Sequence, residues 1–312
     1  MANYPAMRAM ILSEQKPVEE SPLVEREVAE PEVGPGELRI KVSACAVCRT
    51  DLHIAEGDLE LHKSPVIPGH QIVGRIDQIG DGVADRQLGQ RVGVGWLRHV
   101  DDTCEFCRRG RENLCRDSRY TGYDADGGYA EYAVVPNEFA YEMPEGFDDE
   151  HVAPLLCGGL IGYRALERAA VPENGRLLLV GFGSSAHLVL QLALARGHEV
   201  HVVTRSENHI RQAKELGAIW AGTEFRDLPR KMNSVILFAP SGKLVPPSME
   251  ALDRGGICSI AGIHLSDVPM LNYAQHLFQE RELRSVTANT REDARRLLGE
   301  AAGAQIRPQT TR

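Results

Sequence analysis

The sequence lacks the patterns typical of membrane proteins, of secreted proteins and of nucleic-acid-binding proteins. No run of about 18 apolar residues occurs, so no membrane-spanning helix is expected. The start, Met1-Ala2-Asn3-Tyr4-Pro5, has no charged segment followed by an apolar one, so no secretion signal is expected. Lysine and arginine (35) are outnumbered by aspartate and glutamate (44), and the net charge of −9 leaves no basic excess to attract nucleic acid or an anionic membrane. These absences predict a cytoplasmic protein.

The composition is otherwise that of a soluble globular protein. Apolar residues make up 43% of the chain and charged residues 25%, which excludes a wholly disordered chain. At about 150 residues per domain, 312 residues predict two domains.

The seven cysteines are the feature that composition leaves unexplained. Their number is odd and the chain has no secretion signal, so a disulfide framework is a poor interpretation. Cys104, Cys107 and Cys115 are clustered, which in a cytosolic protein favours metal binding or catalysis. Cys258 lies in an apolar run and is expected to pack in a core.

The two halves of the chain have different patterns. Alternation at 38–42, and similar patterns at 72–79 and 128–135, predict a β-rich first half. In the second half, short apolar strands at 176–180 and 199–204 alternate with helical segments, which predicts a parallel sheet with helices on both faces. The expected domains are 1–150 together with 288–312, which would be catalytic, and 151–287, which would bind a nucleotide.

A glycine motif follows the strand at 176–180. Gly181, Gly183 and Ala186 form G-x-G-x-x-A, with Ser184 and Ser185 between them. In this pattern the glycines permit a tight turn and a close approach of a diphosphate to the start of a helix. The motif predicts a dinucleotide site, and the alternative is an ordinary tight turn between a strand and a helix.

The end of the next strand bears on the choice of cofactor. An acidic residue there would bind the ribose 2′-hydroxyl of NAD. This chain has Thr204 and Arg205 instead, and the arginine could pair with a 2′-phosphate. NADP is therefore favoured over NAD, although Arg205 as an ordinary solvated side chain is the alternative.

Cysteine and histidine residues far apart in the sequence suggest a metal site. The segment from Cys45 to His53 is followed by His70 and by Cys157. Two cysteines and one histidine can hold zinc and leave a fourth position open for substrate. A thiol redox protein that uses Cys45 and Cys48 is the alternative, but it leaves His70 and Cys157 unexplained.

These residues and the glycine motif resemble those of zinc-dependent alcohol dehydrogenases of the medium-chain dehydrogenase/reductase family, from about residue 8 to 305. The resemblance implies an α/β fold, with a β-rich GroES-like catalytic domain and a Rossmann-type nucleotide-binding domain. It also implies that Cys48, His70 and Cys157 hold a catalytic zinc and that Asp51 positions the metal. The family commonly has glutamate where this chain has Gln71, which puts a role of that carboxylate in ligand exchange in doubt.

The resemblance implies further roles. Thr50 would bond the substrate hydroxyl and His53 would relay its proton to solvent. Arg49 would contact the cofactor diphosphate, Ile161 would pack against the nicotinamide, and Trp96 would form a wall of the substrate pocket.

A second metal site is expected at the clustered cysteines. Cys104, Cys107 and Cys115 have C-x₂-C-x₇-C spacing, and relatives have a fourth cysteine where this chain has Asp101. Aspartate can also ligate zinc, so a mixed structural zinc site is expected. The alternative is a decayed site with three free thiols. Two neighbouring side chains are fallback ligands: His99 and Asp102.

The predicted activity is hydride transfer between a primary or secondary alcohol, or its aldehyde or ketone, and NAD(P). A polyol or sugar dehydrogenase of the same family is the nearest alternative. Relatives usually continue beyond the point where this chain ends, so a truncated, catalytically impaired NADP- or zinc-binding protein is another. The resemblance also implies a homo-oligomer, either a dimer or a tetramer.

Overall fold

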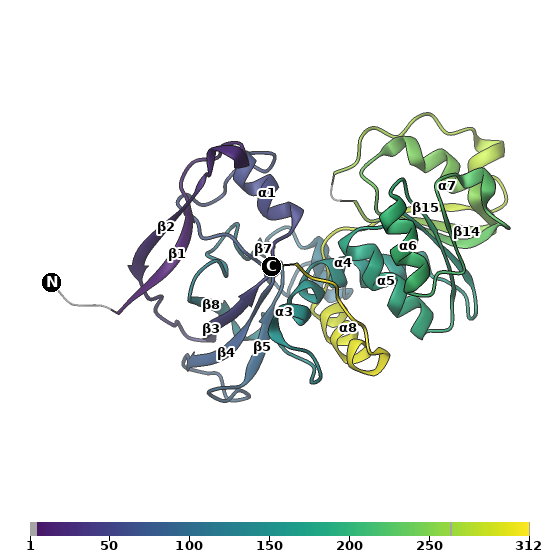
Figure 1. Ribbon diagram of the computed structural model, residues 1–312. Coiled ribbons are helices and arrows are strands. Elements are labelled where there is room, and N and C mark those ends of the chain that lie inside the picture. Colours follow the sequence, from purple (N-terminus) through teal and green to yellow (C-terminus); the bar gives the residue numbers. More distant parts are fainter. Residues whose placement is uncertain (1–4, 263, 312) are drawn as a thin grey trace. The chain divides into compact units, whose positions relative to one another are not determined.

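The computed structural model describes residues 5–262 and 264–311. It contains two compact units, each of which is drawn from more than one stretch of the chain (Figure 1). The first comprises residues 1–157, 288–298 and 309–312, and the second comprises residues 158–287 and 299–308. No helix in the described ranges is long and apolar enough to cross a membrane.

The first unit is built around a five-stranded antiparallel sheet. In sheet order its strands are β8 (Tyr132–Pro136), β3 (Glu37–Cys45), β4 (Ile72–Ile79), β5 (Arg91–Val94) and β9 (Ala140–Glu142). Two short ribbons accompany the sheet: β1 (Ala6–Leu12) with β2 (Leu23–Ala29), and β6 (Leu97–His99) with β7 (Arg119–Tyr120).

The predicted alternation explains the core of this sheet. Leu38 and Ile40 on β3 are fully buried, and Ile40 is paired with Ile76 on β4. The strands predicted at 38–42 and 72–79 are confirmed. The strand predicted from residue 128 begins only at Tyr132, because residues 127–129 form backbone hydrogen bonds with residues 67–69 instead.

The helices of the first unit are short. They are α1 (Arg49–Glu56), α2 (Glu105–Arg108), α3 (Asp149–Val152) and the single turns η1 (Val18–Glu20), η2 (Glu112–Leu114), η3 (Asn137–Phe139) and η4 (Ala153–Leu156).

The second unit contains a six-stranded sheet in which every strand pair is parallel. In sheet order its strands are β12 (Trp220–Gly222), β11 (Glu199–Val203), β10 (Arg176–Val180), β13 (Met232–Leu237), β14 (Leu252–Ile260) and β15 (Glu282–Ser285). The central strands are continuous buried runs, as expected for a sheet covered on both faces. The predicted fold class, a β-rich domain with a Rossmann-type parallel sheet, is confirmed.

Helices precede, connect and follow the strands of this sheet, and the last of them begins in the first unit and ends in the second (Figure 1). They are α4 (Gly158–Ala169), α5 (Ser184–Ala195), α6 (Glu207–Glu215), α7 (Val245–Ala251), the turns η5 (Phe225–Asp227) and η6 (Gly242–Leu244), the π-helical turn η7 (Tyr273–Leu277) and α8 (Arg291–Ala304). The strand order reverses between β10 and β13, and such a reversal is where parallel sheets bind ligands, beyond the carboxyl ends of the strands.

Candidate metal and nucleotide sites

The first unit brings together Cys48, His70 and Cys157. Cys48 is the N-cap of α1, His70 lies in the loop before β4, and Cys157 follows η4. The Cys48 Sγ lies 3.3 Å from His70 Nε2 and 3.8 Å from Cys157 Sγ. All three donor atoms lie within 4.8 Å of one another. Two sulfurs and one imidazole nitrogen at this spacing fit zinc, with one position of a tetrahedron left over.

Asp51 fixes the orientation of this cluster from the first turn of α1. One carboxylate oxygen accepts the Cys48 backbone N–H at 2.8 Å, and the other accepts His70 Nδ1–H at 3.1 Å. The histidine is therefore held with Nε2 toward the cysteines, the arrangement that metal-binding histidines commonly adopt. Burial opposes the charged forms of both side chains, yet their mutual attraction lowers the pKa of Asp51 and raises that of His70 to about 10.

The two thiols of this cluster differ in acidity. A hydrogen bond from the Cys157 thiol, acting against burial and aided by the charge of His70, lowers the pKa of Cys48 to about 4. The same hydrogen bond, together with burial, raises the pKa of Cys157. The pair therefore carries one thiolate near neutral pH, and a divalent cation would favour ionisation of the second thiol.

A tight backbone crossing places His70. Gly69 has a φ of +95°, and a Cβ there would lie 2.6 Å from the ring of Tyr129 and 2.9 Å from Cys45 Sγ. The Gly69 carbonyl accepts the Gly128 N–H at 2.8 Å. A side chain at position 69 would separate these segments and displace the histidine.

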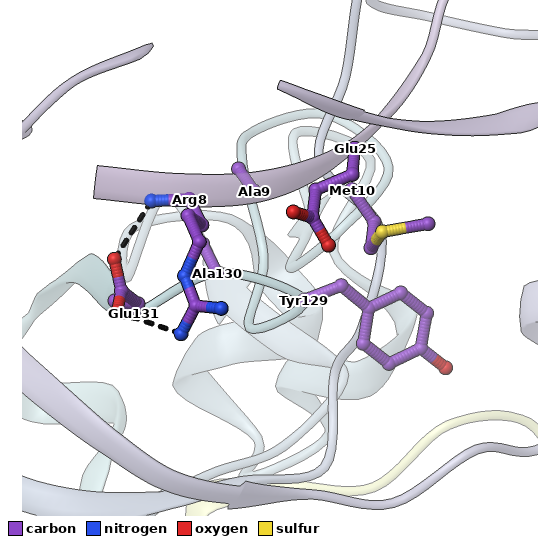
Figure 2. Close-up of a pocket in the computed structure, with 7 residues that line it drawn as sticks. All are labelled: Arg8, Ala9, Met10, Glu25, Tyr129, Ala130 and Glu131. Atoms are coloured by element: carbon purple, nitrogen blue, oxygen red, sulfur yellow. Dashed lines mark hydrogen bonds and ion pairs between the residues drawn. The ribbon is translucent and has the colours of Figure 1, made fainter. Parts of the chain in front are cut away.

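Tyr129 belongs to this crossing. It helps line a surface hollow of about 250 Å³ together with Arg8 and Glu131, and Figure 2 shows its ring pointing away from that pair. Its hydroxyl is buried and lowers the pKa of Asp51. Burial and the negative charge of Asp51 raise the pKa of Tyr129, so the phenol keeps its proton.

Thr50 and His53 both lie on α1 but have different surroundings. The Thr50 side chain is 3% exposed, and among the described residues its hydroxyl has no hydrogen-bond partner. His53 Nδ1 lies 2.6 Å from a carboxylate oxygen of Asp58, just beyond the end of α1. Arg49 is exposed, and the described chain gives it no ion-pair partner.

An aromatic group centred on Trp96 lies beside His70 of the metal cluster. The Trp96 ring meets the His70 ring edge-on, with centroids 4.9 Å apart. It also stacks on Tyr120 at 4.8 Å and lies 5.8 Å from Tyr123. The half-buried Trp96 is therefore part of an apolar aromatic wall beside His70.

Gln71, which departs from the family pattern, is buried, and its side chain is hydrogen-bonded to the backbone. Its side-chain amide donates to the Ala46 carbonyl at 3.1 Å, which ties the residue after His70 to the loop before Cys48.

The second cluster comprises Asp101, Cys104, Cys107 and Cys115, whose donor atoms also lie within 4.8 Å of one another. An Asp101 carboxylate oxygen accepts backbone N–H groups of Cys104 at 2.8 Å and Thr103 at 2.9 Å. These hydrogen bonds, the first of them most strongly, lower the pKa of Asp101 to about 2. The carboxylate is therefore ionised, and the set of three sulfurs and one oxygen fits a structural zinc.

The two fallback ligands lie outside this cluster. Of the residues that the structure describes, His99 joins no group with metal-binding geometry, and neither does Asp102. The Asp102 carboxylate is instead hydrogen-bonded to Arg291.

The glycine motif of the second unit lies at the reversal of strand order. Gly181 has a φ of +87°, and a Cβ there would lie 2.9 Å from the backbone nitrogen of Ala239, which follows β13. A Cβ on Gly183 would meet open space. Gly183 is the N-cap of α5, and no side chain caps the helix, so its first amides remain available to an anion. The uncapped N-terminus of α5, with open space beside Gly183, fits a diphosphate.

The other nucleotide candidates lie in the same unit. Ser184 and Ser185 begin α5, and Ile161 is half-buried on α4. Thr204 is buried at the end of β11, whereas Arg205 is exposed, and the described residues include no ion-pair partner for it.

Sequence reasoning missed several residues around these sites: Asp58, Tyr120, Tyr123, Tyr129 and Arg291. No local pattern marks them. Their contacts depend on the fold, and an aromatic or charged side chain in a loop is common without any such contact.

Comparison with known proteins agrees with this geometry. Residues 34–145 match the model of the alcohol dehydrogenase GroES-like domain. The chain is 51% identical over 310 residues to a "probable alcohol dehydrogenase AdhA" of Mycobacterium tuberculosis (strain CDC 1551 / Oshkosh), and the match covers 98% of this chain and 90% of that protein. It is 33% identical to an alcohol dehydrogenase of Geobacillus stearothermophilus, over 97% of this chain and 90% of that protein.

Solved structures extend the comparison. A cobalt- and zinc-bound thermostable alcohol dehydrogenase from Pyrobaculum aerophilum superposes with a TM-score of 0.87 at 25% identity, covering 97% of this chain and 90% of that one. A putative zinc-binding dehydrogenase from Sinorhizobium meliloti 1021, bound to NADP, superposes with a TM-score of 0.86 at 28% identity, covering 97% of this chain and 90% of that one. By its metal-binding clusters, its fold and its similarity to these proteins, the chain belongs to the zinc-dependent medium-chain alcohol dehydrogenase family.

Proposed function

We propose that the enzyme transfers hydride between a primary or secondary alcohol, or the corresponding aldehyde or ketone, and NADP. The observation that carries the proposal is the buried, unpartnered hydroxyl of Thr50 beside the cluster of Cys48, His70 and Cys157. A buried hydroxyl without a partner costs free energy, and a substrate hydroxyl would satisfy it.

Zinc held by Cys48, His70 and Cys157 would supply a Lewis acid that makes a bound alcohol more acidic and polarises a carbonyl. The chain's own residues then orient the substrate and move its proton. Thr50 Oγ accepts the proton of the substrate hydroxyl and passes its own toward His53. Asp58 accepts His53 Nδ1–H, so Nε2 is the nitrogen that takes the proton to solvent. Asp51 holds the His70 ring in register throughout.

The second unit would bind the cofactor, which supplies the acceptor for the hydride. The uncapped N-terminus of α5, at Gly183 and the amides of Ser184 and Ser185, would hold its diphosphate, and Arg49 would add a positive charge. Ile161 would pack against the nicotinamide.

The preference for NADP rests on Arg205. This arginine follows the strand next to β10, where an acidic residue would otherwise select the 2′-hydroxyl of NAD. Because no described carboxylate pairs with Arg205, its guanidinium can pair with a 2′-phosphate without breaking an existing ion pair.

The aromatic wall favours a simple alcohol over a polyol. Trp96 meets His70 edge-on, and Tyr120 and Tyr123 stack on Trp96, so the aromatic group on this side of His70 suits an apolar substituent. A polyol would need several polar partners there to satisfy its hydroxyls.

A substrate panel tests the activity. The zinc-loaded enzyme is mixed with NADP⁺ and primary alcohols, secondary alcohols or polyols, and formation of reduced cofactor is followed by absorbance. Turnover of simple alcohols above polyols, abolished by Cys48→Ser, is expected. Turnover of polyols alone would support a polyol or sugar dehydrogenase. Cofactor binding without any turnover would support a catalytically impaired NADP- or zinc-binding protein.

We further propose that the enzyme is a cytoplasmic homo-oligomer, a dimer or a tetramer. The segment before β15 exposes three large apolar side chains, Met270 by 95%, Tyr273 by 68% and Phe278 by 53%, which a second subunit could cover. All seven cysteines are free, as is typical of a reducing compartment. Light scattering tests the assembly: Met270→Ser combined with Phe278→Ser should reduce the measured mass.

A further inference from the structure

Arg291, the first residue of α8, lies among three carboxylates of the first unit. Its guanidinium donates to Glu112 at 2.7 Å and to Glu138 at 2.5 Å, and it also donates to Asp102. Its backbone N–H donates to the second oxygen of Glu112. The three acids come from separate segments: the loop before α2, the turn η2 and the turn η3.

Two of these acids flank the second metal cluster. Asp102 directly follows the ligand Asp101, and Glu112 precedes the ligand Cys115 by three positions. One guanidinium therefore binds both the start and the end of the segment that carries all four ligands.

The backbone at Asp102 is in an uncommon conformation. Its φ is +55°, in the left-handed region that side chains other than glycine seldom adopt. The turn it makes sets the direction of Asp101, whose carboxylate accepts the Thr103 and Cys104 amides. Asp101 is the one ligand of the cluster that binds through oxygen, and oxygen is a weaker donor to zinc than a thiolate, so this ligand depends most on its placement.

The ion pair between Arg291 and Glu112 is shielded from water, whereas the side chains of Asp102 and Glu138 are 53% and 61% exposed. The side chains of Arg291 and Glu112 are 16% and 12% exposed. Arg291 Nε donates to one Glu112 oxygen at 3.2 Å and Nη2 donates to the other at 2.7 Å, which gives the pair a fixed geometry. The guanidinium also lies over the Phe139 ring at 5.1 Å. Phe139 packs in one apolar cluster with Cys115, and Cys104 and Cys107 border that cluster.

We propose that Arg291 is a positioning residue for the second metal site. By binding Asp102 and Glu112 it holds the turn at 101–104 so that the Asp101 carboxylate stays in the fourth ligand position. This inference rests on the metal cluster alone and does not depend on the alcohol, the cofactor or Thr50.

The test uses Arg291→Gln in the full-length, zinc-loaded enzyme. Zinc content per chain is measured after dialysis against a weak chelator, and the rate of cysteine alkylation is mapped by mass spectrometry. Loss of a group that orients a metal ligand commonly weakens binding by about 10–100-fold. Zinc is expected to fall from about two per chain to about one, with the thiols at 104, 107 and 115 labelled about tenfold faster. Cys48 and Cys157 serve as the internal reference and should be unaffected.

Matched variants separate positioning from general folding. Arg296→Gln removes an exposed arginine of the same helix, which pairs with the exposed Glu292 at 2.7 Å, and it should retain both zincs. Arg291→Lys keeps the charge but not the planar fork and should restore part of the zinc. Asp102→Gly fits the left-handed backbone but removes the carboxylate, and it should also lose zinc.

Three results would overturn the proposal. One is Arg291→Gln retaining both zincs and the original labelling rates. Another is zinc retention by Asp102→Gly. The third is labelling of the fully buried Cys258 in step with the three cluster thiols, because that would show loss of the fold as a whole.

Discussion

Replacing Arg205 by glutamine should remove most of the proposed preference for NADP. The side chain is exposed at the carboxyl end of β11, and no described residue pairs with its charge, so the substitution breaks no bond in the free enzyme. A hydrogen bond between charged groups is worth about 1.5–3 kcal/mol, which corresponds to about 10–150-fold in affinity. Exposure to solvent screens the pair, so we expect the lower end, about tenfold.

The assay compares kcat/KM for NADP⁺ and NAD⁺ at a saturating alcohol concentration. The value for NADP⁺ should fall about tenfold in Arg205→Gln, while the value for NAD⁺ stays within about twofold. The effect should shrink at high ionic strength. Arg211→Gln is the control, because it removes the same charge from α6, where Arg211 bonds Asn208 at 2.6 Å.

Two outcomes would refute the reasoning about Arg205. An unchanged ratio between the cofactors would mean that the arginine is an ordinary solvated side chain. An equal fall for both cofactors would mean that it contacts a part they share, such as the diphosphate.

Four further perturbations follow from the structure. Thr50→Val should lower kcat by about 10²–10⁴-fold, as expected for loss of a proton-transfer group, whereas Thr50→Ser should restore most of it; equal rates in both variants would exclude the hydroxyl. Cys45→Ser should retain zinc and turnover, since Cys45 joins neither metal cluster; loss of turnover would favour the thiol redox alternative. Asp51→Asn should weaken zinc binding about 10–100-fold, measured by competition with a chelator, and unchanged affinity would contradict its orienting role. Burial lowers the pKa of His201, whose ring has no hydrogen-bond partner among the described residues, so the unfolded chain binds a proton that the folded one does not. The free energy of unfolding should therefore decline as the pH falls below about 6.5, and His201→Leu should reduce this decline when thermal unfolding is followed at several pH values. An unchanged decline in the variant would exclude His201 as its source.

Patterns that are local in the sequence predicted the structure best. The turn from Gly181 to Ala186 follows its strand and begins α5 as expected, because its geometry depends on neighbours in the chain. The alternation at 38–42 predicted a strand for the same reason. The segment at 128 departs from its pattern, because a distant partner, residues 67–69, competes for its backbone hydrogen bonds.

Contacts between residues far apart in the chain could not be predicted from sequence patterns. Cys48 and Cys157 are 109 positions apart, and only resemblance to a family suggested pairing them as ligands. Asp58 and Tyr129 had no such support, because a carboxylate after a helix or a tyrosine in a loop has many possible partners. Arg291 lies 179 positions from Glu112, and nothing in either neighbourhood suggests that they meet.

The distance along the chain between the second metal cluster and Arg291 has a consequence for synthesis on the ribosome. All four ligands lie between residues 101 and 115, so the cluster can take up zinc soon after that segment emerges. Arg291 is made 176 residues after Cys115, which at about 5–20 residues per second is a delay of about 9–35 seconds. During that interval Asp102 and Glu112 have no guanidinium between them. During that interval the local turn alone would have to hold the metal, more weakly than in the finished chain, and thiols without metal would be left open to oxidation.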